Sequence, residues 1–74
     1  MKTDFTIRGE LITLDALLKA SGLVNSGGQA KEVISLSRVK VDGSIELRRA
    51  RKLRGGEVVE FDGHEIHVHA EPAS

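Results

Sequence analysis

Hydrophobic and polar residues alternate near the start of the chain. Phe5 and Ile7 are separated by a single polar residue, and Gly9 then interrupts the pattern. Alternation with a period of two is typical of a strand with one buried face. The pattern therefore predicts a short strand over residues 3–7, at the edge of a sheet.

The spacing of apolar residues changes to three and four in two later stretches, as expected for amphipathic helices. The first predicted helix covers residues 14–21, with Thr13 as its N-cap and Gly22 at its end. Its inner face consists of Leu14, Leu17, Leu18 and Ser21. The second predicted helix covers residues 27–36 after the capping residue Ser26. Its inner face consists of Ala30, Val33, Ile34 and Ser37.

Period two returns in the second half of the chain and predicts two β-hairpins. The dipeptide Asp-Gly occurs at residues 42–43 and again at 62–63, each time between short apolar segments. This dipeptide favours the tight turn of a two-residue hairpin. The first hairpin has apolar positions at Val39, Val41, Ile45 and Leu47, with Lys40 and Glu46 between them. The second has them at Val58, Val59, Phe61, Ile66, Val68 and Ala70.

Residues 48–54, with the sequence RRARKLR, lie between the hairpins and fit neither period clearly. Leu47, Ala50 and Leu53 recur every three residues, which is also compatible with one helical turn. We predict an irregular segment, here named the basic arm. The predicted order is thus one strand, two helices and four short strands, and residues 71–74 are expected to form a frayed tail.

The chain has 74 residues and no cysteine, which limits its chemistry. This length fits one small domain with a single core. A sequence without cysteine excludes disulfides, thiolate metal sites, iron–sulfur clusters and cysteine nucleophiles. The charges among the first ten residues are unlike a secretory or membrane-spanning segment. We therefore expect a soluble, cytoplasmic protein.

The formal net charge is zero, but the charges are separated along the chain. Residues 26–54 contain eight basic and three acidic residues, a net charge of +5. Residues 55–74 contain five acidic residues and no lysine or arginine, a net charge of −5. Because salt screens charge effects beyond about 10 Å, the basic segment can bind a polyanion locally.

The basic arm is either a solvated surface loop or part of a polyanion-binding surface. Lys31 and Lys40 favour binding, because they belong to predicted elements that should meet the arm. Four of the five basic residues of the arm are arginine, whose planar group can grip two phosphate oxygens. The two aromatic residues, Phe5 and Phe61, fit the core, so phosphate contacts are expected rather than base stacking.

Three other motifs carry weaker signals. Ser26 and the two glycines after it either bring a phosphate to the N–H groups of the second helix or simply cap that helix, and the two roles are compatible. His64, His67 and His69 lie close together, but no further ligand is spaced for a tetrahedral site, so no metal is predicted. The sequence shows no nucleophile–base pair and no phosphate loop, so neither catalysis nor a cofactor is predicted.

Four groups of residues occur in a specific order between residues 13 and 61. They are Leu14-Asp15 with Leu18, Ser26 with Ala30, Lys31 and Ile34, Val39-Lys40-Val41-Asp42-Gly43, and Gly56-Glu57 with Val59. Together they resemble the S4 RNA-binding domain, in which the last two groups read V-x-V-N-G and G-D-x-I. The resemblance implies an α+β fold with the αL motif, a single small domain in which two helices pack on a small, mostly antiparallel sheet of short strands.

Two residues depart from the pattern of that family. The family usually has Ser-Arg at the start of the second helix, with the arginine contacting RNA, whereas Gly27 stands here. Ser37 replaces a usual glycine near the end of that helix, so its backbone must either avoid or bear a left-handed conformation. The variant Ser-Gly-Gly-Gln-Ala-Lys with an R-x-R-K-L tail resembles the stand-alone bacterial YbcJ-like S4 proteins.

Charge placement and resemblance both indicate a non-catalytic module that binds structured RNA, ribosomal or transfer, on a ribosome or other ribonucleoprotein. The expected RNA-binding residues are Lys31, Arg38, Lys40, Arg48, Arg49, Arg51, Lys52 and Arg54, with Lys19 and Ser26 as secondary candidates. The alternative is a protein-interaction module that docks through the acidic C-terminal hairpin or the basic arm. We expect a monomer without a membrane partner, because no long apolar stripe is left over.

Overall fold

The computed structural model describes residues 1–72. Its elements follow the order β1 (Lys2–Thr6), β2 (Ile12–Thr13), α1 (Leu14–Ala20), α2 (Gly27–Ser35), β3 (Val39–Val41), β4 (Ser44–Ile45), β5 (Lys52–Leu53), β6 (Val58–Phe61) and β7 (His64–His69). Both predicted helices and both hairpins are present, and each helix ends one residue earlier than predicted.

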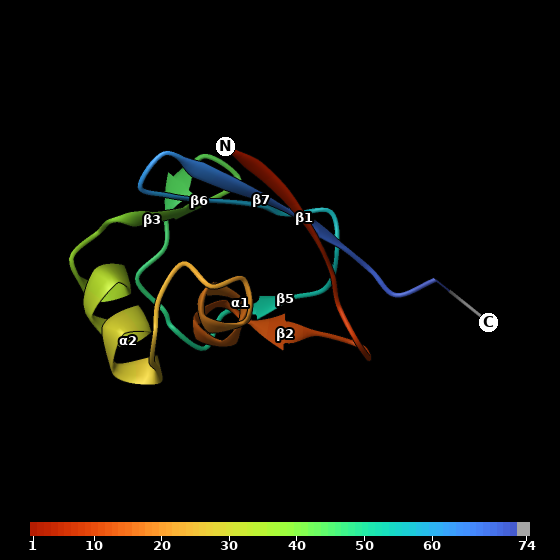
Figure 1. Cartoon of the computed structure of the whole chain (residues 1–74), viewed down its shortest axis with the longest axis horizontal. Helices are drawn as coiled ribbons and strands as arrows, with labels where there is room; N and C mark the ends of the chain where they lie inside the picture. The colour runs from red at the N-terminus through yellow and green to blue at the C-terminus, as the bar shows by residue number, and fades with distance from the viewer. Residues whose placement is uncertain (73–74) are drawn as a thin grey trace.

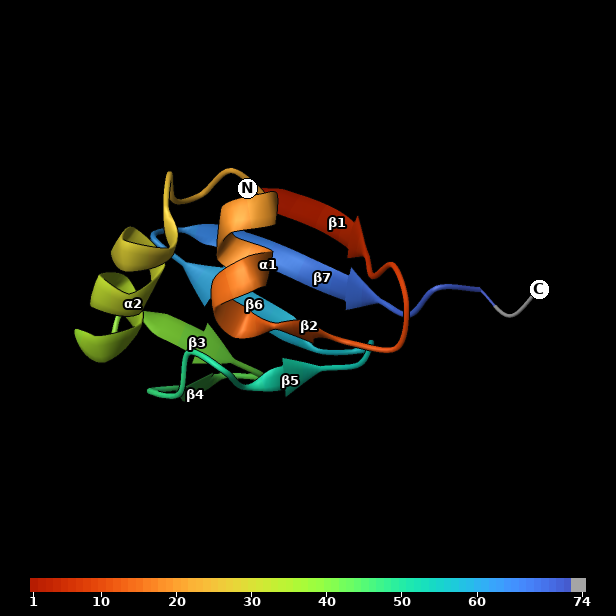
Figure 2. The ribbon, with the colours of Figure 1, turned by 90° about the horizontal axis from the view of Figure 1, so that it is seen from below.

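Five strands form one sheet in the order β1-β7-β6-β3-β4. Its neighbouring strands are antiparallel except for β1 and β7, which run parallel. The prediction of an edge strand near the N-terminus is confirmed, as is the mostly antiparallel sheet. Both helices lie on the same side of this sheet (Figure 1), and α1 crosses over its face when the molecule is seen from below (Figure 2).

The predicted order omitted a second, two-stranded sheet. In it β2 pairs antiparallel with β5, with Ile12 opposite Leu53 and Thr13 opposite Lys52. The basic arm is therefore not irregular throughout, since Lys52 and Leu53 form strand β5. Two-residue strands are too short to show a periodic pattern, so the sequence carried no signal for this pairing.

The helix boundaries arise from local chemistry, although only one cap matches the prediction fully. The Ser26 hydroxyl accepts a hydrogen bond from the backbone N–H of Gln29 at 3.1 Å, as an N-cap does. Thr13 occupies the N-cap position of α1, but its hydroxyl donates instead to the Asp15 carboxylate at 2.6 Å. Ser37 lies beyond α2 with a φ of 62°, so this residue does bear the left-handed conformation.

Both Asp-Gly turns have positive φ at the aspartate and at the glycine, as a tight hairpin requires. The alternation after the first turn is nevertheless inverted. Ile45 is 54% and Leu47 59% exposed, while Glu46 is only 7% exposed. Ile45 is paired with Lys40 and lies in β4, the strand at one edge of the sheet. Glu46 consequently faces the basic arm.

The core lies between the sheet and the helices and collects apolar residues from nearly every element. It consists of Ile7, Leu14, Leu17, Leu18, Val24, Ala30, Val33, Ile34, Val39, Val41, Leu53, Val59, Phe61, Ile66 and Val68. Phe61 is buried and Phe5 packs against the cluster, as predicted for both aromatic residues. Of the helices in residues 1–72, neither has the length and apolar character needed to span a membrane.

The predicted frayed tail spans residues 71–74, of which 73 and 74 lie outside the described residues. The Glu71 carboxylate accepts a hydrogen bond from the backbone N–H of Gly9. The chain just after β7 is thereby joined to the segment that follows β1.

Candidate nucleic-acid interface

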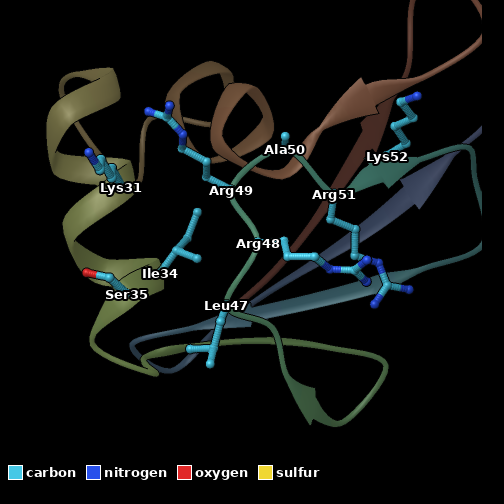
Figure 3. A pocket seen from close by; sticks show the side chains of 9 residues that line it. All are labelled: Lys31, Ile34, Ser35, Leu47, Arg48, Arg49, Ala50, Arg51 and Lys52. Atoms are coloured by element: carbon cyan, nitrogen blue, oxygen red, sulfur yellow. The ribbon is translucent and has the colours of Figure 1, made fainter.

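A hollow of about 840 Å³ lies between α2 and the basic arm, and we name it the basic groove. Its lining residues are Lys31, Ile34, Ser35, Leu47, Arg48, Arg49, Ala50, Arg51 and Lys52 (Figure 3). Five of these nine residues are basic and none is acidic. The structure thus brings five of the predicted RNA-binding residues, Lys31, Arg48, Arg49, Arg51 and Lys52, to one surface.

The basic arm is held in place through its backbone. The N–H groups of Leu14 and Asp15, at the start of α1, donate to the carbonyls of Arg51 at 2.9 Å and Arg49 at 3.0 Å. The first N–H groups of a helix have no partner within the helix, so these carbonyls satisfy them. With the pairing of β2 and β5, the contacts fix a segment that has little regular structure of its own.

The arginine side chains leave the arm in two directions. Arg49 points toward the helices, on the side of the groove where Lys31 lies (Figure 3). Arg48 and Arg51 border the groove, but their guanidinium groups lie together on the other side of the arm, away from α2. The arm therefore presents positive charge on both of its sides.

Glu46 binds the two arginine side chains that point away from α2. Its carboxylate accepts hydrogen bonds from the backbone N–H of Arg48 at 3.1 Å, from Arg48 Nε at 3.2 Å and from Arg51 Nη1 at 2.8 Å. The hydrogen bonds from Arg48 and Arg51 lower the pKa of Glu46 to about 2, although burial acts to raise it. The same carboxylate raises the pKa of Arg48. Glu46 is thus ionised whenever the protein is near neutral pH.

Glu46 was not among the predicted site residues, because the sequence pattern makes it the polar position between Ile45 and Leu47 in a predicted strand. A signal was present, because an acidic residue stands two and five positions before arginines in an otherwise basic run. Nothing in that spacing showed that the carboxylate would be buried.

Arg38 and Lys40 lie elsewhere, beside a second hollow of about 420 Å³ that we name the mixed-charge hollow. Its lining residues are Arg38, Lys40, Glu60, Phe61, Asp62, Gly63, His64 and Glu65. Arg38 Nη2 is 3.9 Å from Asp62 Oδ1, and its guanidinium carbon lies 5.3 Å from the centre of the Phe61 ring. The two predicted RNA-binding residues therefore share their surface with three acidic side chains and do not line the basic groove.

The remaining predicted residues, Arg54, Lys19 and Ser26, are exposed and also lie outside the lining of the groove. The Ser26 hydroxyl is engaged as the cap of α2. Next to it, a Cβ added to Gly27 would meet no atom within 4 Å, so the helix has room for a side chain there.

Two of the three histidines of β7 each contact one carboxylate. His69 Nε2 lies 2.8 Å from Asp4 Oδ1, and His67 Nε2 lies 3.5 Å from Glu65 Oε2. The hydrogen bond with His69 lowers the pKa of Asp4. Within residues 1–72, no group of three histidine, cysteine or acidic side chains is arranged to hold a metal ion.

These features define an S4 domain: the S4 family model matches residues 5–69, and the chain belongs to this family. The chain is 44% identical over 57 residues to YbcJ of Escherichia coli strain K12, which covers 77% of this chain and 81% of YbcJ. A solution structure of the same relative has a TM-score of 0.65 and 38% identity, and the match covers 93% of this chain and 86% of that one. It is described as revealing an αL motif involved in RNA binding.

A second relative comes from Bacillus subtilis strain 168 and carries the name "Probable ribosome maturation protein RlbA". It is 41% identical over 63 residues, which covers 85% of this chain and 89% of that protein. The resemblance to the S4 family and to its YbcJ-like members is confirmed. The match to the family model also extends beyond residues 13–61 at both ends.

Proposed function

We propose that this protein is a non-catalytic module that binds structured RNA, ribosomal or transfer, through the basic groove and the arm. The observation that carries the proposal is a groove lined by five basic and no acidic side chains, on a backbone held by α1 and β2. Five cations with a single buried carboxylate, Glu46, between two of them leave an excess of positive charge on a fixed surface, which is suited to a polyanion.

The relatives support this proposal. The solution structure of YbcJ is described in terms of RNA binding, and the name of RlbA refers to ribosome maturation. We propose a ribosome-associated role for this chain as well, as a cytoplasmic monomer. The partner would be an RNA that forms or joins the ribosome.

The chemistry of the groove favours contacts with the phosphate backbone. Arg48, Arg49 and Arg51 can each offer two parallel N–H groups to phosphate oxygens. Phe5 and Phe61 both pack in or against the core, so neither is free to stack on a base. Phosphate contacts fix position and orientation without reading sequence, so the shape of the RNA should determine selectivity.

An amide chemical-shift titration at two salt concentrations tests the proposal. A ribosomal stem-loop and a transfer RNA would be added separately to the ¹⁵N-labelled protein. We expect shifts at Lys31 and across residues 46–53. If four or five phosphates are contacted, log affinity should fall against log salt with a slope of about −3 to −4.5. Shifts that are absent, insensitive to salt or confined to residues 57–71 would contradict the proposal.

A protein-interaction module is the second candidate, because three large apolar side chains are exposed and one of them, Leu47, lines the groove. Leu36, Ile45 and Leu47 are each more than half exposed. Exposed apolar clusters commonly mark interaction sites. The same titration separates the two candidate functions. Absence of chemical-shift changes with both RNAs would favour the protein-interaction module.

A further inference from the structure

The proposed function leaves open how the two arginines on the far side of the arm act. Resting on that function, we propose that Arg48 and Arg51 together form a binding site for one phosphate group of the RNA, and that Glu46 is the positioning residue that aligns them.

The geometry around Glu46 places both guanidinium groups on one carboxylate. Glu46 Oε1 lies 2.8 Å from Arg51 Nη1 and 3.5 Å from Arg48 Nη2, while Oε2 lies 3.2 Å from Arg48 Nε. Two cations that would otherwise repel each other are therefore held side by side. Without such an anchor, each long side chain would lose rotamer freedom on binding a phosphate.

The anchored arginines keep donors for a ligand. A guanidinium group has five N–H donors. Arg48 donates two of its five N–H groups to Glu46, and Arg51 donates one. Within the described residues, three N–H groups of Arg48 and four of Arg51 therefore have no other side-chain partner. The Arg48 and Arg51 side chains are 77% and 32% exposed, whereas that of Glu46 is only 8% exposed. A phosphate from solvent would therefore meet the arginines and not the carboxylate.

The charges also favour an anion. Two guanidinium groups and one carboxylate leave a net charge of +1 at this point. The backbone supports the arrangement, because the Arg51 carbonyl accepts from Leu14 and the Arg51 N–H donates to the Arg48 carbonyl at 3.2 Å. This phosphate site lies on the side of the arm opposite Lys31 and Arg49 (Figure 3), so the RNA would contact both sides of the arm.

The substitution Glu46→Gln tests the role of the acid, with Glu32→Gln as its matched control. Glu32 is exposed on α2, one residue from Lys31, so its replacement only removes a negative charge near the groove. Charge alone predicts tighter RNA binding in both variants. If Glu46 positions the arginines, Glu46→Gln should instead weaken binding about tenfold, the equivalent of one charge-assisted hydrogen bond. The salt slope should become shallower by about 0.7–0.9, one phosphate contact.

Two further readouts separate positioning from general damage to the fold. The Nε–H signals of Arg48 and Arg51 should shift on titration with inorganic phosphate, compared with chloride at equal ionic strength, and Glu46→Gln should remove this response. The double variant Arg48→Lys, Arg51→Lys keeps both charges but not the planar groups. It should weaken RNA binding with an unchanged salt slope.

Each outcome decides the proposal. Opposite effects of Glu46→Gln and Glu32→Gln on RNA affinity, with a preserved amide spectrum, support it. Equal or tighter binding by Glu46→Gln, or no response of the arginine signals to phosphate, overturns it. Loss of the proposed function is distinguishable, because then the unmodified protein shows no shift at Lys31 or Arg49 with either RNA. The phosphate titration would still test the arginine pair in that case.

Discussion

The basic groove and the mixed-charge hollow contain the same kinds of cation but differ in what surrounds them. The groove has Lys31 and four basic residues of the arm with no acidic side chain in its lining. The mixed-charge hollow has Arg38 and Lys40 beside three acidic residues, one of which pairs with Arg38 at 3.9 Å. The two regions therefore differ in local charge balance, and the proposed function assigns RNA binding to the one without acidic lining residues.

The two regions also differ in how charge is compensated. In the mixed-charge hollow Asp62 is exposed, Glu60 and Glu65 are partly buried, and all three share the surface with the cations. Beside the groove, the acid that pairs with the arm, Glu46, is buried behind two arginines. A buried anchor holds the cations without presenting negative charge to a ligand. Substitutions in either region therefore test whether this contrast governs RNA binding.

The largest effect is expected from removing cations in the groove. Lys31→Ala with Arg49→Ala should weaken RNA binding tenfold or more, by roughly 1.4 kcal/mol or above, and make the salt slope shallower by about 2. Arg38→Ala with Lys40→Ala is the matched control and should change affinity by less than about threefold, or 0.7 kcal/mol. Fluorescence anisotropy with a labelled stem-loop RNA measures both. Equal losses would show that the contrast between the regions is not functional.

Arg48 and Arg51 are left intact in that comparison for a structural reason. Their removal would leave the buried Glu46 carboxylate without partners, and an unpaired buried charge is costly. A loss of RNA binding in such a variant could reflect a displaced arm rather than a missing contact.

Acid should destabilise the protein through Glu46. Its pKa is about 2 in the folded state and ordinarily 4.5, so the stabilisation is fully present above pH 4.5 and is lost as the pH falls toward 2. Thermal unfolding measured across this range should show a falling Tm. In Glu46→Gln the free energy of unfolding at neutral pH should be lower by about 2 kcal/mol, with a correspondingly lower Tm. The decline of Tm in acid should be smaller than in the unmodified protein. An identical pH profile for both proteins would contradict the assignment.

Adding a cation at the N-terminus of α2 should extend the groove. Gly27 and Lys31 are four residues apart on the helix and so lie on one face. Because a Cβ at Gly27 meets no atom within 4 Å, Gly27→Arg should fold normally and bind RNA about fivefold more tightly, or roughly 1 kcal/mol. Gly27→Ala controls for the helix effect alone and should leave affinity unchanged. No gain from arginine would mean that the RNA does not reach this end of α2.

Removing acids should make the mixed-charge hollow resemble the groove. Glu60→Gln with Asp62→Asn leaves Arg38 and Lys40 with less compensation, and asparagine tolerates the positive φ of 51° at position 62. We expect RNA affinity to rise about threefold, or 0.7 kcal/mol, at low salt and to return to the original value at high salt. Anisotropy titrations at both salts measure this, and a decrease at low salt would contradict it.

The smallest effect is expected at Ser37, the residue that links α2, which lines the basic groove, to Arg38 of the mixed-charge hollow. Ser37 adopts a left-handed conformation between α2 and Arg38, where glycine carries no steric cost. Ser37→Gly should raise the free energy of unfolding by up to about 1 kcal/mol in urea denaturation and leave RNA affinity unchanged. A changed RNA affinity would show that the backbone conformation at Ser37 affects how the basic groove and the mixed-charge hollow are placed relative to each other.

The sequence predicted most of the elements because their signals are local. The apolar spacing of α1 and α2, the cap at Ser26 and the two Asp-Gly turns depend on residues a few positions apart. The position of the basic arm in the chain was also visible. The pairing of β2 with β5 was not, because it joins two dipeptides that are about forty residues apart.

The candidate site was predicted in part. Charge counting found Lys31 and the arm, and the structure places them around one groove. It also included Arg38 and Lys40, since a count along the chain cannot show that Glu60 and Asp62 share their surface. Glu46 entered that count only as one acidic residue, because the alternation of the predicted strand made it a polar position between Ile45 and Leu47.

By itself, the sequence determined the family, the types of element and the segregation of charge, since each depends on residue identity and short spacing. Only the tertiary structure decided which charges remain available to a partner. Availability depends on burial and on neighbours from other elements: the start of α1 holds the carbonyls of the arm, and a buried carboxylate directs two of its arginines. Charge compensation acts over a few ångströms in space, and the fold sets those distances.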